Sequence, residues 1–121
     1  MNENEIEING TVYAPKDSLQ LAERSTDGLA YVIVRTYSAS VFAGYLSRQN
    51  GKEVLLLQAR RIWKWVGAAS LSQLAVDGTS NPSGCKFPCE VPSVLLTEAI
   101  EIIAVTGKAK VSIDEVPLWT Q

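Results

Sequence analysis

The sequence contains no histidine among its 121 residues. That absence excludes Ser-His-Asp and Cys-His catalytic groups, HExxH metal sites and zinc sites made from cysteine and histidine. Cysteine is scarce too, since Cys85 and Cys89 are the two in the chain. Two thiolates are too few for a structural zinc site. Their spacing permits a disulfide, but we expect free thiols of a reducing compartment and no cofactor.

Long apolar runs and an excess of positive charge are also missing. No apolar run reaches the roughly 18 residues of a membrane span, and the opening MNENEIEING lacks the basic and apolar regions of a secretory signal. The formal net charge is −2, from 11 basic and 13 acidic residues. We therefore expect a cytoplasmic protein that binds neither duplex DNA nor a membrane surface.

What is present is enough apolar material for one core. Hydrophobic residues make up 46% of the chain, which fits a single compact domain. Residues 1–30 lack a regular apolar pattern and are predicted to be a variable N-terminal arm, so that residues 31–121 form the domain. A domain of this size is only marginally stable alone, and we therefore expect a homo-oligomer.

A β-hairpin is predicted around Asn50-Gly51, which lies between two apolar runs. Asn-Gly favours a type I′ turn because both central residues need a positive φ. This turn would place Arg48 opposite Glu53, so that opposite charges face each other across the strands.

Two short helices are indicated by their ends. Ser70 and Gln73 form a capping box before an apolar stripe, and Gly78 is placed to end that helix. Thr106 is a plausible cap for a terminal helix, which Pro117 ends.

Further strands are predicted from β-branched and alternating residues. The run YVIVRTY at 31–37 has strand composition, and residues 90–105 alternate in their second half although their propensity also permits a helix. The fold class is therefore α+β, an antiparallel β-sheet built around the Asn-Gly hairpin with two or three short helices.

The stretch ARRIWKWVGAAS, beginning at residue 59, concentrates cations and indoles. On a strand, alternation would place Arg61, Trp63 and Trp65 on one face and Arg60 and Lys64 on the other. A helix would instead place the cations one turn from each other or from an indole. Either conformation keeps positive charge close to an aromatic ring.

This chemistry suits a nucleotide. A base stacks on a tryptophan such as Trp63, while Arg60 and Arg61 offer forked donors to phosphate. Ser70 opens a helix whose free N–H groups favour an anion. The alternative remains that the indoles belong to the core and that the arginines are surface charges whose stems cover them.

No enzyme is predicted, because no nucleophile, base and oxyanion donor come together in a recognisable pattern. The phosphate-binding motifs GxxxxGK[ST] and GxGxxG are also missing. Arg35 lies inside an apolar strand, where a charge needs either a ligand or an internal partner.

Several blocks resemble a family of small phage-encoded proteins. They are YVIVRTYSASVFAGYL, NGKEV, ARRIWKWVGAASLSQLA, CKFP and TEAIEII, and together they span about residues 31 to 119. Within the RTYSA block, Arg35 and Ser38 are included in the predicted ligand set. The chain departs from the family pattern at Ser40, where the family has glycine, and at Lys64, where it has an aromatic residue.

The resemblance implies a function similar to that of phage anti-defence sponges of the Thoeris anti-defence type. Such a protein would act in the host cell cytoplasm as a homo-oligomer and would sequester a cyclic ADP-ribose-like or cyclic oligonucleotide signal without cleaving it. The ligand contacts expected here are Arg35, Ser38, Arg60, Arg61, Trp63 and Ser70. The alternative is a phage accessory module that binds a host factor through the arm and the terminal Val-Pro-Leu-Trp.

Overall fold

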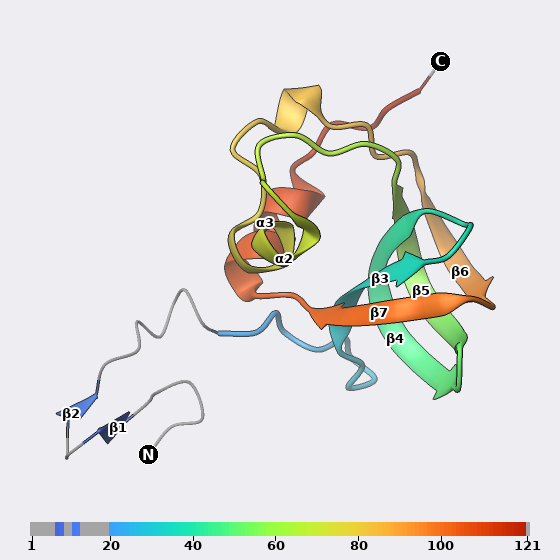
Figure 1. Cartoon of the computed structure of the whole chain (residues 1–121), viewed down its shortest axis with the longest axis horizontal. Helices are drawn as coiled ribbons and strands as arrows, with labels where there is room; N and C mark the ends of the chain where they lie inside the picture. Colours follow the sequence, from blue (N-terminus) through green and yellow to red (C-terminus); the bar gives the residue numbers. More distant parts are fainter. Residues whose placement is uncertain (1–6, 9–10, 13–19, 121) are drawn as a thin grey trace.

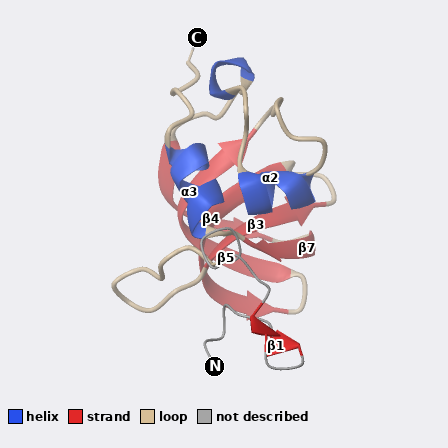
Figure 2. Ribbon diagram, turned by 90° about the vertical axis from the view of Figure 1, so that its left-hand side faces the viewer, coloured by secondary structure: helices blue, strands red, loops and turns tan. Residues whose placement is uncertain are grey.

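The computed structural model of the protein describes residues 7–8, 11–12 and 20–120. Its body is a five-stranded antiparallel sheet in the order β6-β5-β4-β3-β7, with two α-helices packed on one face (Figures 1 and 2). The strands are β3 (Tyr31–Thr36), β4 (Val41–Asn50), β5 (Glu53–Ile62), β6 (Glu90–Leu96) and β7 (Ala99–Ala104). The helices are α2 (Leu71–Asp77), α3 (Gly107–Asp114) and a 3-10 turn at Pro82–Gly84. The predicted α+β class is confirmed.

Two further strands lie in the predicted arm. They are β1 (Glu7–Ile8) and β2 (Thr11–Val12), which pair with each other. Residues 1–6, 9–10 and 13–19 of the arm lie outside the described part. Residues 20–22 run along the start of α3, where the Ala22 N–H donates to the Val105 carbonyl at 2.9 Å and the Gly107 N–H to that of Gln20 at 2.8 Å.

The predicted position of the hairpin turn is wrong by one residue. β4 and β5 pair, but Asn50 ends β4 opposite Glu53, so the two turn residues are Gly51 and Lys52. Arg48 consequently lies opposite Leu55 and not opposite Glu53. Of the two turn residues, only Gly51 has a positive φ, at 61°. This pattern fits a type II′ turn, which needs glycine at the first central position only.

The sheet is strongly curled, and its two edge strands follow each other in the sequence. β6 and β7 lie at opposite ends of the strand order but are joined by Thr97 and Glu98 alone, so the edges meet at one corner (Figure 1). A bulge at Gln58, whose φ is 50°, adds to the bend where β5 crosses Gly44 of β4.

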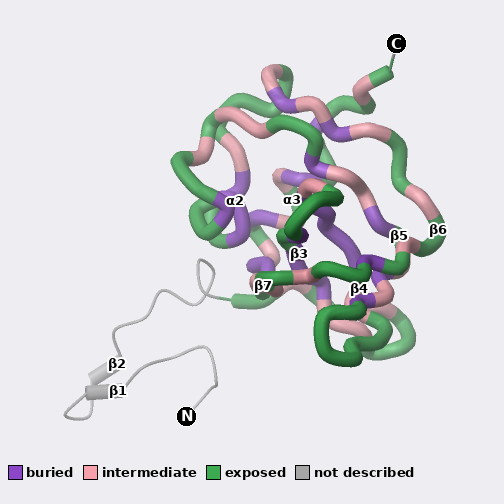
Figure 3. Tube along the Cα trace, turned by 45° about the vertical axis from the view of Figure 1, so that its right-hand side comes forward, coloured by how far each residue is buried: buried purple, intermediate pink, exposed green. Residues whose placement is uncertain are grey.

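Both faces of the curled sheet are buried. The face under the helices packs a cluster that includes Ile33, Ile62, Leu74, Phe87 and Ile113. The opposite, inner face packs a second cluster that includes Val34, Phe42, Val54, Leu56 and Leu96. In Figure 3 the buried positions accordingly run along the central strands and the helices. Cys85 is buried, Cys89 is exposed, and both thiols are free.

The predicted helix caps are confirmed. Ser70 accepts a hydrogen bond from the Gln73 N–H, and Gly78 follows α2 with a φ of 77°. Thr106 accepts from the Ala109 N–H at the start of α3. The strand preference for residues 90–105 is confirmed as well, although the stretch forms two strands. Within the described residues, no helix is long and apolar enough to span a membrane.

Candidate functional site

Arg60, the first predicted phosphate ligand, is built into the fold. All three nitrogens of its guanidinium donate hydrogen bonds of 2.9–3.3 Å to backbone carbonyls, which belong to Phe87, Pro88, Ile113, Val116 and Pro117. Burial lowers the pKa of this arginine from its ordinary value, against the attraction of nearby acidic groups. A ligand phosphate would have to displace these carbonyls, so its predicted role as a ligand contact is not supported.

Arg35 and Ser38 are paired with carboxylates. Arg35 Nε lies 3.1 Å from Glu101 Oε1 across β3 and β7, which supports the alternative of an internal salt bridge. The Ser38 hydroxyl donates to the Glu98 carboxylate at the β6–β7 turn. A phosphate placed here would meet two negative groups, so these positions do not favour an anionic ligand.

Arg61 and Ser70 also have internal partners. Arg61 Nη1 donates to the Ala39 carbonyl at 2.6 Å, and its guanidinium carbon lies 4.3 Å from the centre of the Phe42 ring. The Ser70 hydroxyl is used by Gln73 in capping α2. Five of the six predicted ligand residues therefore already have partners within the protein.

The two tryptophans of the stretch lie in different environments. Trp63 is 58% exposed, whereas Trp65 is partly buried against the cluster under the helices. The prediction that they share a face with Arg61 is wrong, because β5 ends at Ile62 and the strand alternation stops there.

Trp63 instead belongs to a surface group of aromatic and cationic side chains, in which Trp63 and Lys64 are exposed and Lys86 and Trp119 are half-buried. The Trp63 and Trp119 rings are parallel within 4°, with centroids 6.5 Å apart. Lys86 Nζ lies 5.5 Å from the centre of the Trp119 ring. Lys64, which follows Trp63 in the chain, is exposed. Trp63, Lys64, Lys86 and Trp119 are called the tryptophan–lysine surface below.

Backbone hydrogen bonds bring three separate segments together at this surface. The N–H groups of Trp63 and Lys64 both donate to the Lys86 carbonyl, at 3.1 and 3.2 Å, and the Lys86 N–H returns a bond of 2.8 Å to Lys64. The Trp119 N–H donates to the Phe87 carbonyl at 3.1 Å. Each bond joins residues that are far apart in sequence.

The bridge between Lys64 and Lys86 has an electrostatic consequence. Directly opposed residues on antiparallel strands have Cβ atoms about 4.5–5.5 Å apart, and like charges there repel. Neither lysine forms an ion pair with any residue in the described part of the chain. A bound anion would relieve this repulsion, and the neighbouring Trp63 is 58% exposed.

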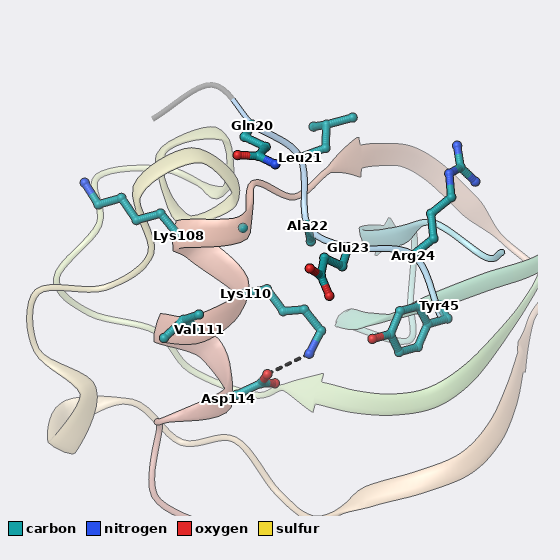
Figure 4. A pocket seen from close by; sticks show the side chains of 11 residues that line it. Gln20, Leu21, Ala22, Glu23, Arg24, Tyr45, Lys108, Lys110, Val111 and Asp114 are labelled. Carbon is teal, nitrogen blue, oxygen red and sulfur yellow. Dashed lines mark hydrogen bonds and ion pairs between the residues drawn. The ribbon is translucent and has the colours of Figure 1, made fainter. Parts of the chain in front are cut away.

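A cavity of about 480 Å³ between residues 20–24 and α3 is a second candidate (Figure 4). Its Lys110 Nζ lies 2.6 Å from Asp114 Oδ2 and 4.8 Å from the centre of the Tyr31 ring. Burial tends to lower the pKa of Lys110, but the hydrogen bond and charge of Asp114 outweigh it and raise the pKa. Lys108 lies 3.8 Å from Asp77. Because these cations already have partners, the cavity offers less to an anion than the tryptophan–lysine surface does.

Comparison with known proteins identifies a family. Residues 29–113 match DUF6948, a domain of unknown function. The chain belongs to the DUF6948 family. The match begins just before β3 and includes Trp63, Lys64 and Lys86, whereas Trp119 lies beyond its end. No curated protein and no solved structure matches this DUF6948 chain.

Sequence reasoning missed Lys86 and Trp119 as parts of the site. Lys86 lies in CKFP and Trp119 follows Pro117, so neither belongs to the stretch that drew attention to Trp63. Their proximity arises from the bridge to Lys86 and from the course of the chain after α3, which no local pattern encodes. The available signal was the terminal Val-Pro-Leu-Trp, which was predicted to contact a host factor and not a nucleotide.

Proposed function

We propose that the protein binds a small nucleotide at the tryptophan–lysine surface and sequesters it without cleaving it. The observation that carries this proposal is the exposed Trp63 ring, stacked on Trp119 beside two lysines that have no acidic partner among the described residues. A base would stack on the indole, and its phosphate would lie against Lys64 and Lys86.

The energetics favour such a ligand over a simple anion. Stacking of a base on an aromatic side chain contributes about 1–3 kcal/mol, whereas exposed charge pairs alone contribute little. Sequestration needs no proton transfer, so a chain without histidine can perform it.

The ligand class is proposed from the resemblance to phage anti-defence sponges. A cyclic ADP-ribose-like or cyclic oligonucleotide signal combines bases with phosphates, which is the chemistry that this surface offers. On this proposal the protein acts in the host cell cytoplasm as a homo-oligomer. It keeps the signal bound because the complex dissociates slowly. The contacts would be Trp63 and the two lysines, with Arg60 outside the contact set.

Calorimetry with cyclic di- and trinucleotides and cyclic ADP-ribose isomers tests the proposal. Trp63→Ala should weaken binding about 5- to 150-fold, the equivalent of about 1–3 kcal/mol. Lys64→Ala/Lys86→Ala should weaken it and reduce its salt dependence. The matched controls are Tyr37→Ala, which removes an aromatic ring that is 79% exposed, and Lys52→Ala in the hairpin turn.

Two results would contradict the proposal. Binding that Trp63→Ala and Tyr37→Ala affect equally would place the site elsewhere. A chemically altered nucleotide, recovered after denaturation of the complex, would show an enzyme instead of a sponge.

A protein-interaction module is the second candidate function. Leu118 is 59% exposed next to Trp119, and an exposed apolar and aromatic group beside lysines also suits a host protein factor. Pull-down from host lysate, with Leu118→Ser and with deletion of residues 1–30, tests this alternative. A specific partner that Leu118→Ser releases, in a protein that binds no nucleotide, would favour it.

A further inference from the structure

We infer that Arg60 is the positioning residue of the tryptophan–lysine surface, because its hydrogen bonds hold the segment after α3 where Trp119 lies on Trp63. These hydrogen bonds of Arg60 are called the clasp below. The inference deepens the proposed function and rests on it where ligand binding is concerned. The clasp and the stacked indoles can be tested without any ligand.

The clasp joins three parts of the chain through one side chain. Arg60 is on β5, and its acceptors belong to two other segments. Phe87 and Pro88 precede β6, whereas Ile113, Val116 and Pro117 form the end of α3 and the turn after it. The planar, fixed geometry of a guanidinium suits several carbonyls at set directions, which a lysine ammonium cannot match.

Beyond Pro117 the Trp119 ring contacts Trp63 and Lys86, and the backbone contacts Phe87. The Trp119 N–H donates to the Phe87 carbonyl at 3.1 Å, and Leu118 forms an isolated parallel bridge with Phe87. Leu118 itself is 59% exposed and adds little burial. Burial of Val116 in the core and the bonds from Arg60 to the Val116 and Pro117 carbonyls therefore fix the point from which Trp119 departs.

Arg60 also fixes the other side of the surface. Its Nη2 donates to the Phe87 carbonyl at 3.1 Å, and the guanidinium carbon lies 5.3 Å from the centre of the Phe87 ring. Lys86 precedes Phe87 directly, and Trp119 bonds to the same Phe87 carbonyl. One guanidinium thus sets the spacing between the segment of Lys86 and the segment of Trp119.

Near-ultraviolet circular dichroism of the full chain without ligand tests the positioning role. The indoles of Trp63 and Trp119, with centroids 6.5 Å apart, lie in fixed asymmetric surroundings and so contribute to this spectrum. Arg60→Lys should lower the near-ultraviolet signal to the level expected of Trp119→Phe, while thermal unfolding stays cooperative as in a folded protein. Arg61→Lys is the matched control, since Arg61 also bonds a carbonyl and stacks on a ring but does not touch the terminal segment.

A double-mutant cycle with cyclic ADP-ribose and cyclic di-AMP as probes tests the link to binding. Arg60→Lys should weaken binding about tenfold, the equivalent of a lost stacking contact. In a Trp119→Ala background the same substitution should change binding by less than about twofold, because the residue through which it acts is gone.

The outcomes separate the inference from the proposed function. An unchanged near-ultraviolet signal in folded Arg60→Lys would overturn the inference, whether or not nucleotides bind. Loss of the signal in a protein that binds neither probe would support the clasp and count against the proposed function.

A measurement on the unmodified protein covers the case in which Arg60→Lys does not fold. The Arg60 Nη2–H, which donates to the Val116 carbonyl, and the Trp119 backbone N–H should exchange with deuterium after the same local opening, since both bonds hold the segment after α3. Protection factors that differ by more than about tenfold would overturn the inference.

Discussion

Ser40 is held in a backbone conformation that serine seldom adopts. Its φ is 73°, within the left-handed region that favours glycine. The carbonyl of Ser40 accepts bonds from the N–H and the hydroxyl of Thr36, which closes the loop between β3 and β4. The conformation is therefore imposed by the loop, and the side chain gains only a 3.5 Å contact with the Ile62 carbonyl.

Ser40→Gly should raise the free energy of unfolding by about 0.5–1 kcal/mol. A left-handed conformation costs a residue with a Cβ about 1–2 kcal/mol, of which the greater freedom of glycine in the unfolded chain offsets a part. Urea unfolding measures the difference. Ser93→Gly, on exposed strand β6 without a positive φ, should instead lower stability, and a Ser40→Gly protein that is equally destabilised would contradict the strain.

The buried Tyr31 makes stability depend on high pH. Burial raises the pKa of its phenol, and the nearby charge of Asp114 raises it further. The unfolded chain releases this proton near pH 10 while the folded protein keeps it. The contribution of Tyr31 to stability is thus complete below pH 10 and is lost as the pH rises above 10.

Tyr31→Phe should therefore remove part of the alkaline loss of stability. Between pH 9 and 11 the unmodified protein should lose about 1 kcal/mol more than the variant in urea unfolding. Tyr37→Phe serves as the control, since Tyr37 is 79% exposed. Equal losses in the Tyr31→Phe variant and the unmodified protein would contradict this assignment.

At the scale of elements, the sequence predicted the helix caps correctly but not the register of the hairpin strands. Ser70 and Thr106 cap α2 and α3 as predicted, because capping involves residues within three positions of each other. The pairing of β4 with β5 was predicted, but its register was predicted wrongly. Gly51 suits the first central position of a type II′ turn as readily as the second central position of a type I′ turn. Composition alone does not distinguish the two.

The site was less predictable than the fold for a similar reason. The role of Trp63 as an exposed indole depends on where β5 ends, and the role of Arg60 depends on carbonyls 27 to 57 residues away. An arginine that satisfies backbone carbonyls and one that awaits a phosphate look alike in sequence. Their difference lies entirely in tertiary contacts.

The bend in the sheet predicts a sensitive position on β4. A Cβ added at Gly44 would lie 3.1 Å from both the Leu57 carbonyl oxygen and the Ala59 Cα, which are backbone atoms of the bulged strand. Gly44→Ala should therefore cost about 1–3 kcal/mol in the free energy of unfolding, as overpacking does.

Gly107→Ala is the matched control for that prediction. An added Cβ there meets only carbonyl oxygens at 3.8 and 3.9 Å, and alanine favours the helix that begins at Gly107. We expect this variant to be neutral or slightly stabilised in thermal unfolding. A Gly44→Ala protein of unchanged stability would show that the bulge can shift to make room.

At the scale of the whole molecule, self-association is a prediction that light scattering can check. The expected solution mass is a multiple of 13.2 kDa, because a chain this small gains stability from a partner. A mass of 13.2 kDa at about 100 μM would contradict it.

The curled sheet has a further consequence, which concerns the time that folding takes. β3 must pair with β7, as Val32 does with Ala104, although β4, β5, α2 and β6 lie between them in the sequence. Pairings between such distant segments form late, because the chain loses loop entropy before the contacts repay it. The hairpin of β4 and β5 is expected to form early, and the closing of the sheet by β7 is then the slow step. A variant that weakens the β3–β7 pairing should therefore change the refolding rate most, while one on the exposed surface of Trp63 should leave it as it was.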